Sequence, residues 1–233
     1  MKLPQHSLVR LLLNIDEVQP RLMAAILKRF TKATKEERPL ATEVNLPSLI
    51  LSQMAWLNRI IDPTLVVDTL LDLLNTSSSA IKKEIISHLA AIVADKEQIR
   101  VAFALCDLLN ENNSLTAAVL DALGDLSLPS LEASELRNKI AKRLLTVPME
   151  TIPVLLTFVF KKVQPDEASN LIQETRLNFD RSLKKRDRDR VVKETVNDCI
   201  SLAVESLQNS MMRSKPLADA WFKGIVFAFK YVC

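Results

Sequence analysis

The sequence predicts an all-α fold, an α-solenoid of stacked antiparallel helix pairs of the HEAT or armadillo type. Leu, Ile, Val and Ala recur at helical spacing, whereas aromatic residues make up only 5% of the 233 residues. Hydrophobic residues make up 48% of the chain, which is ample for a buried core. Successive helix pairs begin near residues 46, 80, 114 and 152, and this regular spacing indicates a structural repeat.

Residues 1–45 are expected to form an N-terminal segment with two short helices and a charged linker. The helices are predicted over residues 8–13 and 21–30, with a break at Gln19 and Pro20. Residues 31–43 are rich in charged residues and Thr, which is typical of a solvated loop.

Residues 46–180 are expected to form the helical-repeat solenoid. The first helix is predicted over residues 47–61, and Asp62 with Pro63 starts its partner, which ends near residue 74. Three further pairs follow, over residues 80–93 with 98–109, 115–126 with 136–145, and 153–163 with 167–179.

Residues 181–233 are expected to hold a basic linker followed by two helices, over residues 191–207 and 214–233. Residues 181–193 contain seven Lys or Arg residues and two Asp residues. Such a patch can neutralise a phosphate backbone, and the candidate contacts to DNA are Lys184, Lys185, Arg186 and Arg188. The alternative is a solvated linker or helix start whose Arg and Asp residues pair locally. The residues leave both interpretations open.

The last helix carries an unusually placed lysine. Ser214 can cap it, and Leu217 and Trp221 fall on one face. Lys223 lies on the opposite side, surrounded by Asp219, Phe222, Val226 and Phe229. A helix that is apolar almost all round is normally buried on two sides, so Lys223 is expected in or beside an interface. The alternative is that chain following Cys233 covers the second face, since the segment is typical of a truncated piece of a longer protein.

Composition argues against several classes of protein. Two glycines leave no Gly-rich phosphate loop, and two histidines with three widely spaced cysteines offer no metal site, cofactor site or catalytic constellation. The unpaired cysteines indicate a reducing compartment, and no apolar run is long enough to span a membrane. The net charge of +3 is too small for general polyanion binding.

Five blocks of the sequence resemble the Fanconi anaemia group D2 family. Four are LPQHSLVRLLLNIDEVQP at 3–20, QMAWLNRIID at 53–62, NNSLTAAVLDALGDLSL at 112–128 and IPVLLTFVF at 152–160. The fifth, ADAWFKGI at 218–225, is similar to the family's Ala-Trp-Ile-Lys-Ala-Ile segment, whose lysine receives a single ubiquitin. That lysine matches Lys223, although Phe222 and Gly224 replace the family's Ile and Ala.

The resemblance implies a nuclear scaffold for repair of DNA interstrand crosslinks, which is not an enzyme. It implies pairing with the Fanconi anaemia group I paralogue, transfer of one ubiquitin to Lys223 by a multisubunit ligase, and closure of the pair on double-stranded DNA as a clamp. The alternative, which rests on the repeat spacing alone, is a generic α-solenoid interaction module without a role on DNA.

Overall fold

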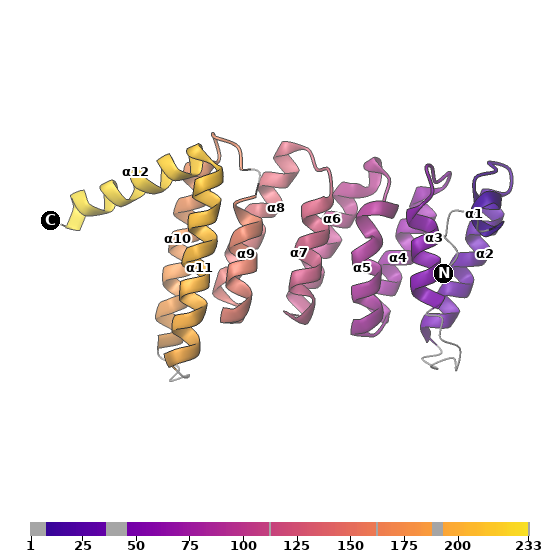
Figure 1. Ribbon diagram of the computed structural model, residues 1–233, viewed down its shortest axis with the longest axis horizontal. Coiled ribbons are helices and arrows are strands. Elements are labelled where there is room, and N and C mark those ends of the chain that lie inside the picture. The colour runs from indigo at the N-terminus through magenta and orange to yellow at the C-terminus, as the bar shows by residue number, and fades with distance from the viewer. Residues whose placement is uncertain (1–7, 36–45, 112, 162, 188–192, 233) are drawn as a thin grey trace. The chain divides into compact units, whose positions relative to one another are not determined.

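The protein is built from helices throughout the part of the chain that the structure describes (Figure 1). The computed structural model describes residues 8–35, 46–111, 113–161, 163–187 and 193–232. Within these ranges, only the backbone is described at residues 35, 110–111, 180, 182–187, 193–199 and 224–232. The predicted all-α class is confirmed.

The chain divides into two compact units. Unit 1 comprises residues 1–109 and 121–127, and unit 2 comprises residues 110–120 and 128–233. The boundaries proposed from sequence character, at residues 46 and 181, stay a prediction.

In unit 1 the helices pack on the next helix along the chain, on the next but one, or on both. These helices are α1 (Leu8–Leu13), α2 (Gln19–Lys35), α3 (Leu46–Ala55), α4 (Pro63–Thr76), α5 (Ser79–Ile92) and α6 (Asp95–Glu111). Helix α3 packs on α5, whereas α2 packs on both α3 and α4. Asp62 caps α4, because its Oδ1 accepts a hydrogen bond from the Leu65 N–H at 3.0 Å.

Unit 2 is also built from packed helices. Its helices are η2 (Asn113–Leu115), α8 (Ser130–Lys142), η3 (Arg143–Leu145), η4 (Met149–Thr151), α9 (Ile152–Val159), α10 (Ala168–Asp187), α11 (Lys193–Arg213) and α12 (Lys215–Val232), while α7 (Thr116–Asp125) contributes to both units. Helix α9 packs on α11, and α10 packs on α8 and α12. Helices α3, α5, α7 and α9 begin within two residues of the predicted repeat starts. Stacked helix pairs are therefore confirmed within each unit.

The predicted end of the first repeat helix is wrong, and Gln19 supplies the physical reason. Helix α3 stops at Ala55, and the irregular residues after it are bound by the Gln19 side chain. Its Nε2 donates to the carbonyls of Leu13, at 2.7 Å, and Arg59, at 2.9 Å, while its Oε1 accepts from the Ile61 N–H at 2.7 Å. Because Gln19 is buried, its hydrogen bonds replace those that a continued helix would make.

Gln19 is also not the helix break that the sequence predicts. It is the first residue of α2, and Pro20 occupies the first turn, where no amide hydrogen is needed. The same helix continues through residues 31–35, which the sequence predicts to be loop, because Phe30 and Thr34 are buried and hold this end of the helix in the core. Thr31 Oγ1 donates to the Leu27 carbonyl at 3.0 Å. Residues 36–43, the rest of the predicted linker, lie outside the described residues.

A buried ion pair fixes the start of α10, the helix that supports α12. Arg137 of α8 donates from Nη2 to Glu167 Oε1, and their side chains are only 8% and 15% exposed. Glu167 Oε1 also accepts the Gln164 N–H at 2.8 Å, so one carboxylate joins α8 to the turn before α10. Further along α10, the buried Asn178 donates to the Ala141 carbonyl at 3.4 Å.

Candidate functional site

Helix α12, which carries Lys223, follows α11 after a connection of one residue, Ser214. The Ser214 N–H donates to the Met211 carbonyl at 3.2 Å, and the Ser214 carbonyl accepts the Ala218 N–H at 3.1 Å. These bonds close the turn, and Pro216 sits in the first turn of α12, where it costs no hydrogen bond. Because the connection is so short, the beginning of α12 lies against α10 and α11, and the helix then runs away from them toward the C-terminus (Figure 1).

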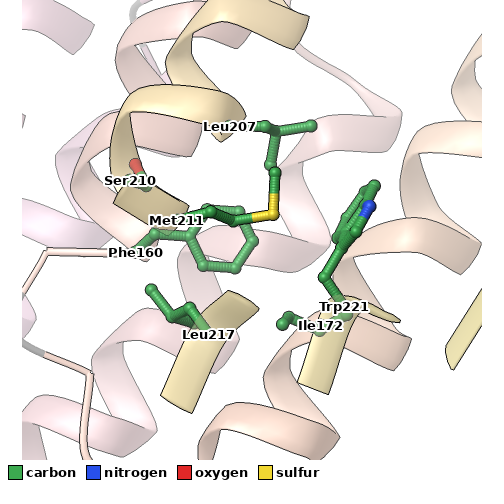
Figure 2. Close-up of a pocket in the computed structure, with 7 residues that line it drawn as sticks. All are labelled: Phe160, Ile172, Leu207, Ser210, Met211, Leu217 and Trp221. Carbon is green, nitrogen blue, oxygen red and sulfur yellow. The ribbon is translucent and has the colours of Figure 1, made fainter. Parts of the chain in front are cut away.

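The inward face of α12 closes an apolar seam. Leu217 and Ala220 are buried, and Trp221 is half-buried beside them. Figure 2 shows the side chains that converge there, which are Phe160, Ile172, Leu207, Ser210, Met211, Leu217 and Trp221. The remaining cavity has a volume of about 10 Å³, at most the space of one water molecule, so the seam is a packing contact. The predicted inward placement of Leu217 and Trp221 is confirmed.

An arginine from α10 adds a directional contact to the seam. The Arg176 guanidinium carbon lies 5.4 Å from the centroid of the Trp221 ring, within the range of a cation–π interaction. Arg176 follows Ile172 by four residues, so the two side chains lie on the same face of α10, one turn apart. Sequence reasoning missed Arg176, because nothing in the periodicity of α10 indicates which helix will lie opposite it.

The outward face of α12 presents Lys223 to solvent. Lys223 and Asp219 are exposed, and Phe222 is 63% exposed despite its large apolar ring. No described residue forms an ion pair with Lys223. Val226 and Phe229 lie on the same helix, but their side chains lie outside the described part of the chain. The structure thus separates Trp221, which faces inward, from Asp219, Phe222 and Lys223, which face outward.

The basic segment lies partly on a helix. Residues 181–187 form the last turns of α10, which was expected to end at residue 179, and Arg181 is exposed. The side chains of Lys184, Lys185 and Arg186 lie outside the described residues, as does the whole of Arg188. Their contact with DNA stays a prediction.

Two properties of the described residues bear on metal binding and on membrane insertion. No group of three or more His, Cys, Asp or Glu side chains gathers there in a way that would hold a metal ion. None of the helices combines the length and apolar content that a membrane span requires.

Fold and site together define a helical-repeat protein with an exposed lysine on its last described helix. The family model described as "Fanconi anaemia protein FancD2 nuclease" matches residues 2–228. The chain therefore belongs to the Fanconi anaemia group D2 family, and the resemblance noted in the sequence is confirmed.

Curated relatives agree with this assignment. The chain is 27% identical to the Fanconi anemia group D2 protein homolog of Rattus norvegicus, 26% identical to that of Mus musculus, and 28% identical to the Fanconi anemia group D2 protein of Gallus gallus. Each match covers 94% of this chain but 16% of the relative, so the chain spans about a sixth of the length of these proteins.

Proposed function

We propose that this chain is the ubiquitin-acceptor segment of a scaffold for repair of DNA interstrand crosslinks, and that Lys223 is the acceptor. The observation that carries the proposal is the exposure of Lys223 on α12, at the position that matches the acceptor lysine of the family segment. Trp221, two residues earlier, is held in the seam, so the lysine is presented on a supported helix.

The chemistry of the transfer needs little from this chain beyond presentation. The neutral Lys223 amine attacks the carbonyl of the ubiquitin thioester, the C–N isopeptide bond forms, and the C–S bond to the conjugating enzyme breaks. The thiolate leaves with the electron pair, and the amine proton passes to a base on the enzyme or to water. Lys223 is thus a substrate, and the chain has no catalytic role in the proposal, although the matched family model carries the word nuclease.

The apolar side chain beside the lysine supports a role in recognition. Phe222 is exposed next to Lys223. Surfaces that another protein covers typically include large exposed apolar side chains. We propose that the Fanconi anaemia group I paralogue covers part of the outward face of α12, which includes Phe222. The multisubunit ligase then reaches Lys223 on this same face.

The DNA clamp in the proposal rests on membership of the family: after modification, the pair of paralogues closes on double-stranded DNA in the chromatin of the nucleus. The sequence-independent contact of residues 181–193 to phosphates rests instead on the positive charge of that segment. Gly224, where the family has Ala, lowers the helix propensity by about 1 kcal/mol, so α12 is expected to open more easily after Lys223.

The deciding experiment is a ubiquitin-transfer assay with the reconstituted ligase, the paralogue and DNA. Wild-type protein is compared with Lys223→Arg and with Lys215→Arg, a control that removes another exposed lysine from the same helix. We expect a single ubiquitin on wild type and on Lys215→Arg, and none on Lys223→Arg. Equal transfer to wild type and Lys223→Arg would refute the assignment of the acceptor.

A generic interaction module remains the second candidate, favoured by a different surface. In unit 1, Leu8 and Leu11 of α1 are 69% and 59% exposed, and Trp56, which lies under the Arg10 guanidinium, is 47% exposed. If the protein binds a partner through this surface, accepts no ubiquitin and does not bind DNA, the result supports the interaction module and not the repair scaffold.

A further inference from the structure

We infer that Arg176 is a positioning residue for ubiquitin transfer: its contact with Trp221 fixes the rotation of α12 about its own axis and so selects Lys223 as the acceptor. The inference rests on the proposed function, and it assigns a role to a residue of α10 that lies outside the acceptor segment. Arg176 is half-buried and carries its charge at the edge of the apolar seam.

Helix geometry couples the tryptophan to the lysine. Residues two apart on an α-helix point about 200° apart around the axis, so a Trp221 ring held inward turns Lys223 outward. The burial agrees, because Leu217 and Ala220 are buried on the side of Trp221, while Asp219, Phe222 and Lys223 are exposed. A rotation of α12 that carried Trp221 out of the seam would carry Lys223 toward α10 and α11.

The contacts of the seam differ in kind. Leu217, Met211 and Ile172 contribute apolar contacts, whose energy follows the area that they bury. The stacking of a guanidinium over a ring is directional, because the cation is attracted to the face of the ring and not to its edge. Arg176 therefore adds a directional preference to the rotation of α12.

The chemistry favours arginine at this position. Its planar guanidinium stacks on an indole and keeps its charge when partly buried, whereas a lysine ammonium is compact and strongly hydrated. Arg176 is also held on a supported helix, because the Arg137–Glu167 ion pair fixes the start of α10. The position of the guanidinium is thus set by α10 and by the contact of α10 with α8.

The test measures both the rate of transfer and the choice of lysine in the reconstituted reaction. The variants are Arg176→Ala, Arg176→Lys and Trp221→Leu, and Glu174→Ala is the matched control, because it removes an exposed charged side chain from another face of the same helix, outside the basic segment. For Arg176→Ala we expect a loss of about two- to five-fold in the rate at saturating ligase, as the energy of a cation–π contact allows. In Arg176→Ala we also expect ubiquitin to appear on Lys215, while the KM of the ligase for this protein stays unchanged. Arg176→Lys should recover only part of the lost rate.

A double variant separates positioning from general loss of stability. If Arg176 acts through the ring, Arg176→Ala lowers the rate in wild type but has no further effect on Trp221→Leu. The inference is overturned if Arg176→Ala transfers ubiquitin to Lys223 at the wild-type rate, or if it has an equal effect with and without Trp221. Failure of the wild type to accept ubiquitin at Lys223 would instead overturn the proposed function, and the role of Arg176 with it.

Discussion

The ion pair between Arg137 and Glu167 should matter far more to stability than an exposed pair of the same chemistry. Glu167→Ala leaves the Arg137 guanidinium, which is 8% exposed, without its carboxylate, and Arg137 Nε already has no hydrogen-bond partner among the described residues. Breaking one side of a buried pair costs about 3–5 kcal/mol. We take the lower end, about 3 kcal/mol, because Glu167 is 15% exposed and water can reach the vacated site.

The Arg59–Asp16 pair supplies the internal comparison. Its Arg59 Nη1 and Asp16 Oδ2 lie 3.5 Å apart, and the two side chains are 71% and 61% exposed. Solvent screens such a pair, so Asp16→Ala should cost no more than about 1 kcal/mol. The two substitutions each remove one carboxylate from an arginine, and they differ mainly in burial.

Urea and thermal unfolding followed by circular dichroism measure both costs. At about 2–4 °C for each kcal/mol in a chain of this size, Glu167→Ala should lower the Tm by about 6 °C or more, and Asp16→Ala by less than about 4 °C. The double variant Arg137→Met with Glu167→Ala should be more stable than Glu167→Ala alone, because it removes the unpaired charge. Equal destabilisation by Glu167→Ala and Asp16→Ala would refute the reasoning.

Two more predictions concern the Gln19 hydrogen bonds and the basic segment. Gln19→Leu should destabilise the protein by about 3 kcal/mol, about one for each of its three hydrogen bonds, of which one is buried and two are part-buried. It should also speed hydrogen exchange at the Ile61 amide, and an unchanged exchange rate there would contradict the assignment. Asn58→Ala, which removes an exposed amide from the same segment, should cost less than about 0.5 kcal/mol. Charge reversal in the basic segment should weaken binding to double-stranded DNA and flatten its salt dependence in a titration by fluorescence anisotropy, whereas an unchanged salt slope would leave the segment as structure only. The four residues to reverse are Lys184, Lys185, Arg186 and Arg188.

The sequence by itself determined the class of fold, the helix pairs and the inward face of α12. These follow from local rules, because the spacing of apolar residues decides which face of a helix is buried. Leu217 and Trp221 could be placed that way, as could the Asp62 cap of α4. The family could also be identified, since its motifs are contiguous stretches of residues.

Only the tertiary structure decided which polar side chains hold the helices in place. Gln19 ends α3 by bonding backbone groups some 40 residues away, and no local pattern signals such a partner. The pairing of Arg137 with Glu167 and of Arg176 with Trp221 likewise depends on which helices meet, and it is packing between distant segments that brings those side chains together. The exposure of Lys223 was likewise decided by the tertiary structure, because periodicity gives the angle of Lys223 on its helix but not which other helix lies opposite it.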